Sequence, residues 1–318
     1  MVLAEFRNRY LGGTMELYRQ VQNLLLIIQP GDSFFPLVDA IDKASHTIKM
    51  TIFRMDDPVV RDALSHAVER KVEVKALVAP TSKGWTKRNK KLIEELSKHG
   101  IEVRTPRSRN AKIERYHYKV MTIDNRQSLI LTFNPTQKNM HYARDFGLLV
   151  RDDAITTELN RLFDADWRGE MFRPADLPLV ISPSGSREKL LELLASAEQS
   201  IRIMDAKLRY KEVIDLLLSK AAAGCSVKII SQKPAPTLAG TGLQVRKLSR
   251  YKLHAKCILV DSERFFIGSQ NLRKSSLERR REVGIVVQDP AMGQKIARVF
   301  DEDWTHATDL IASLKTEA

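Results

Sequence analysis

Two kinds of hydrophobic pattern alternate along the chain. Short apolar runs, typical of buried strands, are separated by longer segments in which apolar residues recur every three to four positions, as in amphipathic helices. Alternation of this kind predicts an α/β sandwich in which helices cover both faces of a mixed sheet. We expect helices over 34–44 and 59–69 and one ending near Trp167, and strands over 48–53, 72–78, 120–123, 128–133 and 146–150.

The same order of elements returns in the second half of the chain. Here we expect helices over 188–197 and 213–222 and one ending at Trp304, and strands over 201–204, 227–230, 257–260, 265–267 and 283–287. A duplicated α/β unit, with two mixed sheets flanked by helices, is therefore the simplest interpretation.

An apolar run near the N-terminus, from Leu24 to Ile28, stands outside this alternation. We predict that it ends an amphipathic helix from Met15 to Gln29, and that residues 1–30 form an N-terminal segment. The run is far too short to span a bilayer. Charged residues interrupt the stretch before it, which argues against a secretory signal.

Polar residues repeat in the same register as the elements. Each member of one set has a counterpart 137 positions later: His117 and His254, Lys119 and Lys256, Asp124 and Asp261, Asn134 and Asn271, Arg144 and Arg281, Asp145 and Glu282, Trp167 and Trp304. Upstream the offset is 153, so the first copy carries extra residues between its early strands and this region. We place the first copy at 31–168, a linker with two prolines at 169–180, and the second copy at 181–318.

Composition narrows the class of partner. Lysine and arginine outnumber aspartate and glutamate by 52 to 39, and the resulting formal charge of +13 favours a nucleic acid or an anionic phospholipid surface. Cys225 and Cys257 are the only cysteines and have no Cys/His cluster around them, so the sequence indicates neither a disulfide framework nor a zinc site. We therefore expect a reducing compartment, and a cytoplasmic protein that can lie peripherally at a membrane.

The duplicated polar pattern resembles the signature of the phospholipase D superfamily, in its phospholipase D and cardiolipin-synthase-like branch. The signature reads His-x-Lys, four residues, Asp, six residues, Gly-Ser-x-Asn, and the second copy matches it completely from His254 to Asn271. In the first copy Leu131 and Thr132 replace the Gly-Ser pair. The resemblance implies that the two copies pack about a pseudo-twofold axis and share one active site, so we expect a monomer with an internal pseudo-dimer.

The residue types suit phosphodiester chemistry without a metal or cofactor. A histidine and a lysine two positions apart on a strand point to the same face, so each copy delivers an imidazole and an ammonium group together. One imidazole can attack phosphorus while the other protonates the leaving oxygen. The expected ligands of the phosphoryl oxygens are Lys119 and Lys256, with directed donors from Asn134 and Asn271.

Further roles are carried over from the resemblance. It implies a covalent phosphohistidine intermediate, with His117 as nucleophile and His254 as general acid; the divergent first motif leaves this order open. Asp145 and Glu282, each 28 positions after its histidine, match the family carboxylates that hold and polarise the imidazoles. We expect supporting roles for four more residues, structural for the two aspartates and either oxyanion contact or turn formation for the two hydroxyls: Asp124, Asp261, Thr132 and Ser269.

Candidate substrate-binding residues flank these motifs. We consider the Trp85 loop as part of an apolar entry surface for a lipid substrate. The run Arg279, Arg280 and Arg281, which precedes Glu282 directly, is considered as a contact for a phosphate or a partner. The basic cluster at 83–91 is interpreted equally well as a binding rim or as the solvated start of a helix.

Three classes of function remain. We favour a phospholipid enzyme that hydrolyses a headgroup phosphodiester or transfers a phosphatidyl group to an alcohol. A nuclease is the second class, with a basic groove formed by Arg104, Arg107, Arg109, Lys112 and Arg115. The third is a non-catalytic module that binds an anionic partner, although the retention of His117, Lys119 and Asn134 argues against a decayed first site.

Overall fold

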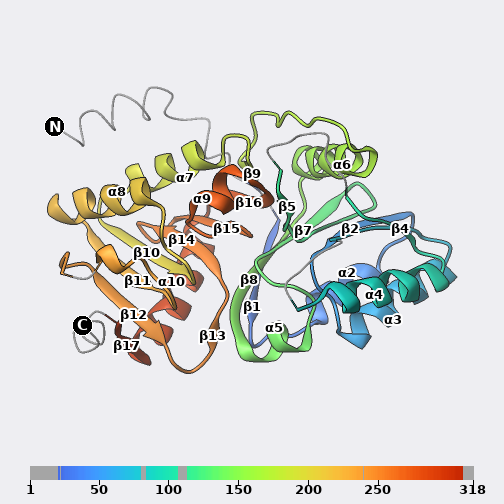
Figure 1. The fold of residues 1–318 in the computed structure, drawn as a ribbon, viewed down its shortest axis with the longest axis horizontal. Helices are drawn as coiled ribbons and strands as arrows, with labels where there is room; N and C mark the ends of the chain where they lie inside the picture. The colour runs from blue at the N-terminus through green and yellow to red at the C-terminus, as the bar shows by residue number, and fades with distance from the viewer. Residues whose placement is uncertain (1–20, 22, 80–83, 107–112, 239, 311–318) are drawn as a thin grey trace.

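The computed structural model describes residues 21, 23–79, 84–106, 113–238 and 240–310, and it contains two α/β halves side by side (Figure 1). Each half is a mixed sheet flanked by helices, which confirms the fold class predicted from the hydrophobic pattern. The halves are related by the sequence duplication, since corresponding elements follow the same order in each.

The first sheet has the strand order β1-β8-β7-β6-β2-β3-β4. Helices α2, α3 and α4 pack with one face of this sheet in a core of their own, and α6 contributes to a second core on the other face. The elements of this half are β1 Leu24–Gln29, α2 Phe35–Asp42, β2 Thr47–Ile52, α3 Pro58–Glu69, β3 Glu73–Val78, α4 Thr86–Lys98, β4 Glu102–Arg104, β5 Arg115–Tyr116, β6 Val120–Ile123, β7 Gln127–Leu131, α5 Gln137–Tyr142, β8 Ala143–Val150 and α6 Asp153–Arg168.

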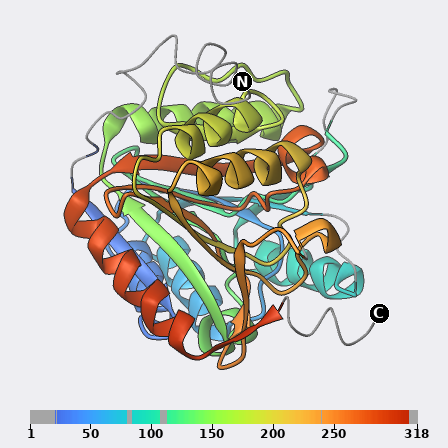
Figure 2. The same ribbon diagram turned by 90° about the vertical axis from the view of Figure 1, so that its left-hand side faces the viewer.

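The second sheet has the order β17-β12-β11-β10-β14-β15-β16-β5, and β9 also pairs with β16. Helices α7 and α8 cover one face, whereas α10 lies on the opposite face (Figure 2). The elements are β9 Leu179–Ser182, α7 Ser186–Ala195, β10 Ser200–Asp205, α8 Lys211–Ala222, β11 Ser226–Ile230, a 3-10 turn Pro236–Leu238, β12 Gln244–Leu248, β13 Lys252–Leu253, β14 Lys256–Val260, β15 Arg264–Gly268, α9 Lys274–Glu278, β16 Arg280–Gln288, α10 Pro290–Thr305 and β17 Ala307–Asp309.

The duplication extends to the signals that start the helices. Asp152 caps α6 by accepting a hydrogen bond from the Ile155 amide at 3.0 Å, and Asp289 caps α10 by accepting one from the Met292 amide at 2.9 Å. A carboxylate at this position satisfies an amide that has no partner within the helix. The two capped helices, α6 and α10, therefore begin at equivalent positions after β8 and β16.

Each copy gives one short strand to the sheet of the other. β5 from the first copy runs parallel to β16, with Arg115 opposite Arg280, and β13 from the second copy runs parallel to β8, with Lys252 opposite Ala143. A central core then joins side chains of both sheets with α6 and α10. The exchange places the segment that follows each short strand at the junction between the copies.

Two buried ion pairs also cross this junction. Arg144 contacts Asp303 at 2.5 Å, and its pseudo-symmetric counterpart Arg281 contacts Asp166 at 3.1 Å. All four side chains are buried. Arg281 is therefore a structural residue of the interface, and its prediction as a substrate-binding residue is wrong.

The structure also corrects the prediction for the N-terminal apolar run. Residues 24–29 form strand β1, which pairs antiparallel with β8, instead of the end of a helix. Leu26 enters the central core and Ile27 the outer core of the first copy, so both faces of the strand need apolar side chains. The first sheet thus begins before residue 31, and β9 begins at Leu179 inside the expected linker. The remainder of the predicted helix, 15–20, lies outside the described residues.

Candidate active site

The two motif histidines lie at the junction, directly after the exchanged strands. The His117 amide donates to the Arg281 carbonyl at 2.9 Å, and the His254 amide donates to the Arg144 carbonyl at 3.1 Å. Each histidine is thus fixed by the backbone of the opposite copy. The duplicated sequence produces one two-sided centre instead of two separate ones.

The carboxylates hold these imidazoles across the junction. His117 Nδ1 lies 2.7 Å from Glu282 Oε2, and His254 Nδ1 lies 2.9 Å from Asp145 Oδ1. Each carboxylate therefore serves the histidine of the other copy, not the one that precedes it by 28 positions in the sequence. A carboxylate on Nδ1 fixes the tautomer and leaves Nε2 to face a reacting group.

Burial keeps both imidazoles neutral in the ligand-free site. Burial lowers the pKa of His117 to about 3 against the opposing attraction of Glu282, and lowers that of His254 to about 4 against that of Asp145. Although burial acts to raise the pKa of Glu282, its interactions with His117 and Lys119 outweigh this and hold it at about 2. The pair at neutral pH is therefore a carboxylate with a neutral imidazole, as a nucleophilic histidine requires.

Two buried lysines lie beside the histidines. Lys119 and Lys256 are each 2% exposed, and each ammonium donates to the carbonyl of its own motif histidine. Lys256 also donates to the carbonyl of Thr132 in the first copy, at 3.2 Å. Burial lowers the pKa of both ammonium groups. A phosphate bound between the two ammonium groups would raise their pKa again, because a nearby opposite charge favours the protonated form.

Although the first motif diverges from the second, Thr132 supplies a hydroxyl at the position of Ser269. Thr132 Oγ1 donates to Asp145 Oδ1 at 2.6 Å and accepts from the Phe146 amide at 2.9 Å. At the equivalent position Ser269 accepts from the Val283 amide at 3.1 Å, and its hydroxyl helps to lower the pKa of Glu282. The Thr132 hydroxyl therefore orients Asp145, and Ser269 occupies the matching place in the second copy. Sequence reasoning left this choice open between oxyanion contact and turn formation.

The two asparagines lie three residues beyond the ends of β7 and β15, just after these hydroxyl residues. Asn134 and Asn271 are buried, at 3% and 7% exposure. Among the residues that the structure describes, Asn134 Oδ1 has no hydrogen-bond partner. A buried amide of this kind is available to a ligand at the junction.

The half-sites differ in one respect that the motif comparison missed. In the second copy Asp205 lies opposite Lys256 on the neighbouring strand, and accepts from the Leu272 amide at 2.9 Å. Burial raises the pKa of Asp205 to about 6. In the first copy the Phe53 ring packs against the His117 ring at 4.4 Å between centroids, and the Lys119 ammonium lies over the Phe53 ring. The sequence marks Asp205 and Phe53 only by their position at the end of a strand.

The motif aspartates lie at the other end of their strands. Asp124 accepts hydrogen bonds from three consecutive amides at 45–47, and Asp261 accepts from three at 198–200. Each carboxylate thereby ties the turn after a motif strand to the start of β2 or β10. Neither aspartate lies near the histidines, so both stabilise the fold and do not contact the reacting groups.

The remaining predicted substrate-binding residues lie partly beside the histidine centre and partly on other surfaces. Trp85 lies just before α4 with the guanidinium groups of Arg54 and Arg88 over its ring, and Arg279 pairs with Glu114 at 2.8 Å. Arg280 lies in register with Arg115, two residues before Glu282 on the same strand. Among the expected groove residues, Arg104 stacks on Trp167 at the far edge of the first sheet, and 107, 109 and 112 lie outside the described residues.

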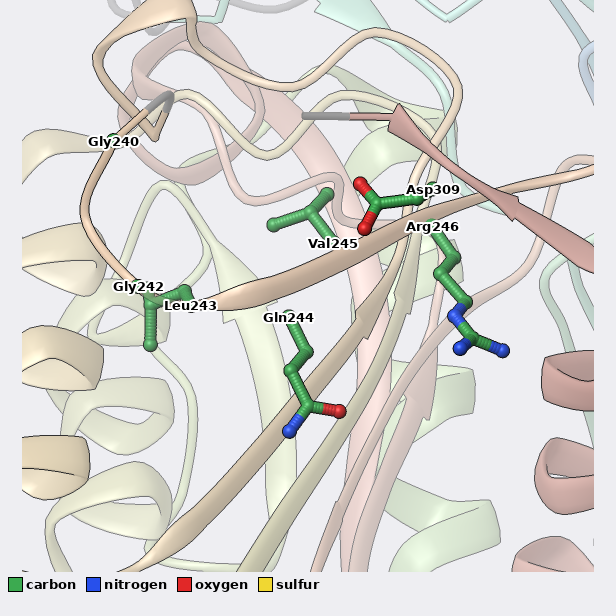
Figure 3. Close-up of a pocket in the computed structure, with 7 residues that line it drawn as sticks. All are labelled: Gly240, Gly242, Leu243, Gln244, Val245, Arg246 and Asp309. Carbon is green, nitrogen blue, oxygen red and sulfur yellow. The ribbon is translucent and has the colours of Figure 1, made fainter. Parts of the chain in front are cut away.

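A separate hollow lies at the outer edge of the second sheet (Figure 3). It is lined by residues 240 and 242–246 and by Asp309, and it shares no residue with the histidine centre. In the described part of the chain, no helix combines the length and the apolar composition needed to cross a bilayer.

Comparison with known proteins identifies the family to which the chain belongs. The family model described as "Cardiolipin synthase, PLD-like domain" matches residues 37–167 and 190–304. The polyphosphate kinase of Mycolicibacterium gilvum is 26% identical and the match covers 87% of this chain and 41% of that protein. The cardiolipin synthase of Geobacillus thermodenitrificans is 24% identical, with 88% of this chain and 65% of that protein covered. The chain thus spans between two fifths and two thirds of the length of these relatives.

Two solved structures share the fold. Polyphosphate kinase from Porphyromonas gingivalis has a TM-score of 0.74 at 19% identity, covering 92% of this chain and 49% of that chain. Phosphatidylserine synthase from Haemophilus influenzae has a TM-score of 0.73 at 12% identity, covering 98% of this chain and 92% of that chain. Both matches extend over the two copies. The family model spans both motifs, and the chain therefore belongs to the cardiolipin synthase-like family of the phospholipase D superfamily.

Proposed function

We propose that the chain transfers a phosphoryl group between oxygen atoms through a phosphohistidine on His117, with His254 as general acid. The observation that carries this proposal is the crossed pairing of His117 with Glu282 and of His254 with Asp145 in one buried centre. Two imidazoles whose Nδ1 atoms are fixed by carboxylates, so that Nε2 is left for the reacting group, suit a double displacement.

The first step forms a bond from His117 Nε2 to phosphorus and breaks the bond from phosphorus to the leaving oxygen. The leaving oxygen takes a proton from His254, whose pKa rises when the negative phosphate enters. Lys119 and Lys256 stabilise the charge on the equatorial oxygens. In the second step a water or alcohol gives its proton to His254 and attacks phosphorus, and the bond to His117 breaks.

We propose a phospholipid as the substrate, either hydrolysed or used for phosphatidyl transfer at the surface of an anionic membrane. The family description and the names of the Geobacillus and Haemophilus proteins support a lipid phosphodiester, and the charge of +13 supports binding to an anionic surface. The second candidate is a nucleic acid phosphodiester, which the same charge and the cations around the mouth of the site favour.

One activity panel tests these candidates. Purified protein is offered phosphatidylglycerol and phosphatidylethanolamine vesicles with and without glycerol, and separately single- and double-stranded DNA and RNA. We expect headgroup release or a new phospholipid, together with cosedimentation with anionic vesicles, and no product from His254→Asn. Cleavage of DNA or RNA by the wild type alone, without lipid turnover, would replace the lipid proposal with the nuclease.

A truncation that tests the N-terminal segment in this panel must spare strand β1. Removing residues 1–29 would delete β1 from the first sheet, whereas removing 1–20 leaves that strand and the buried Val21 in place. We expect deletion of 1–20 to weaken vesicle binding without loss of the fold. Unchanged vesicle binding would rule out a membrane role for these twenty residues.

A further inference from the structure

Like charges oppose each other next to the histidine centre. Arg115 on β5 is paired in register with Arg280 on β16, two residues before His117 and Glu282 respectively. Residues two apart on a strand share a face and lie about 7 Å apart. The two guanidinium groups therefore form the next row beyond the His117–Glu282 pair. Directly opposed like charges destabilise a sheet unless an anion lies between them.

Two further cations join this row from separate loops. Lys207 follows Asp205, and its amide donates to Asp205 Oδ1 at 2.6 Å; Arg273 follows Asn271, and its amide donates to the Asn271 carbonyl at 2.7 Å. Burial and then repulsion from Arg273 lower the pKa of both Lys207 and Arg280. The cluster of Arg115, Lys207, Arg273 and Arg280 is therefore short of negative charge.

The nearest carboxylates already have other partners. Glu114 pairs with Arg279 at 2.8 Å, and Glu282 is held by His117. Within the described residues, none of the four cluster cations forms an ion pair with a carboxylate. By contrast, the neighbouring Arg281 has its own carboxylate in Asp166.

All four cations of the cluster are present on one side of the pseudo-twofold axis only. The counterparts of Arg115 and Lys207 are Lys252 and Arg54, which keep the positive charge. The counterparts of Arg273 and Arg280 are the uncharged Thr136 and Ala143, so the pseudo-symmetric position lacks half of the cations. This difference in charge would distinguish the two ends of a substrate.

We propose that Arg115, Lys207, Arg273 and Arg280 form a subsite for a second phosphate, carried by the substrate or by the acceptor about 7 Å from the reacting phosphorus. The inference rests on the proposed function for the position of the reacting phosphate at the histidines. It adds that the substrate pair contains two phosphate groups, whether in a lipid headgroup or along a nucleic acid strand.

Equilibrium binding of small phosphates tests the subsite without turnover. Titration calorimetry compares 1,3-propanediol bisphosphate, whose two phosphates can span the two rows, with propyl phosphate, which has one. We expect the bisphosphate to bind the wild type about tenfold more tightly or better, and the combined Lys207→Gln and Arg273→Gln variant to lose this preference. The combined Lys295→Gln and Arg298→Gln variant removes an equal charge from the exposed face of α10 and should retain the preference.

The subsite proposal would be contradicted if the wild type bound propyl phosphate and the bisphosphate with nearly equal affinity. It would also be contradicted if the double variant kept the wild-type ratio of these two affinities. Because no turnover is required, a protein that binds the bisphosphate selectively but transfers no phosphoryl group would contradict only the proposed function. Vesicles with a phosphomonoester on the headgroup, and a short oligonucleotide, then compete for bisphosphate binding. Competition by the vesicles assigns the second phosphate to a lipid, and competition by the oligonucleotide assigns it to a nucleic acid; failure of both contradicts the proposal.

Discussion

His117 and Glu282 lie 2.7 Å apart although 165 residues separate them in the chain. The reciprocal pair, His254 and Asp145, has the same relation across the same junction. Neither copy therefore holds a complete histidine–carboxylate pair of its own. Both copies are needed to assemble this site, since each half supplies the carboxylate that contacts the other's imidazole.

The crossed carboxylates lead to a first prediction about activity. Glu282→Gln and Asp145→Asn keep the shape of the side chain but remove the charge that fixes each imidazole, so turnover should fall on the order of a hundredfold in each. Steady-state kinetics on a soluble phosphodiester measures the loss. Circular dichroism should show an unchanged fold, and near-wild-type turnover in either variant would contradict the pairing.

The divergent first motif leads to a second prediction. Thr132→Ser keeps the hydroxyl that bonds Asp145, so its turnover should stay close to that of the wild type. Thr132→Val keeps the volume but leaves Asp145 Oδ1 and the Phe146 amide without this partner, and turnover should drop about tenfold. Ser269→Ala is the matched change in the second copy. Equal activities of the serine and valine variants would show that the hydroxyl has no such role.

The ion pairs across the junction lead to a third prediction, on stability. Arg144→Met leaves Asp303 buried and unpaired, and should reduce the free energy of unfolding by about 3–5 kcal/mol. Replacing both partners, as in Arg144→Met with Asp303→Leu, should recover much of this loss because no charge remains buried. Urea unfolding of both variants provides the comparison. Arg281→Met and its double variant with Asp166→Leu repeat the test on the symmetric pair, and a single variant as stable as the wild type would contradict the assignment.

The depressed histidine pKa values lead to a fourth prediction. In the unfolded chain a histidine binds a proton below a pKa of about 6.5, whereas His117 and His254 in the folded protein do so only near 3 and 4. The two histidines therefore make the unfolded state bind more protons over this window, and they outweigh the single Asp205, whose raised pKa acts in the opposite direction, so stability should fall as the pH is lowered from 7 towards 4.

Substitution of a histidine separates this effect from that of the carboxylates. His254→Asn removes one titrating group, so its unfolding free energy should fall less steeply between pH 7 and pH 4.5 than that of the wild type. Glu282, with a pKa of about 2, acts mainly below its unfolded value of about 4.3 and so at lower pH. If the unfolding free energies of the wild type and His254→Asn fell equally steeply with pH, the assignment of neutral imidazoles would be contradicted. A wild-type stability that rises on acidification would contradict it as well.

Much of the fold could be predicted because the physical signals are local. The alternation of apolar runs with helical periodicity indicated the two sheets, and strands β6, β10 and β14 lie where the pattern predicts them. The run at 24–28 was predicted to end a helix but forms strand β1. An uninterrupted apolar stretch suits a strand buried on both faces as well as a helix, so the sequence pattern could not distinguish the two. The short exchanged strands β5 and β13 carry no pattern of their own, since each has only two residues.

The repeat in the sequence indicated which residues meet at the junction, but it did not indicate how they are connected. Equal spacing of 28 residues from each histidine to its carboxylate could not indicate that the partners are exchanged, because this depends on how the copies pack. The run at 279–281 was treated as one group, yet side chains alternate along β16: Arg280 shares the face of Glu282, and Arg281 points into the central core. Asp205 and Lys207 lie outside the motif and became visible only through their contacts.

The most direct test of the account is to trap the covalent intermediate. Wild type, His117→Asn and His254→Asn are mixed with a soluble phosphodiester, quenched in base within milliseconds to seconds, and analysed by intact mass and by peptide mapping. The account predicts an acid-labile phosphoryl adduct on the peptide that contains His117, accumulation of this adduct in His254→Asn with a good leaving group, and no adduct in His117→Asn. Rapid turnover by the wild type without any adduct, or an adduct on His254 in the His117→Asn protein, would contradict it.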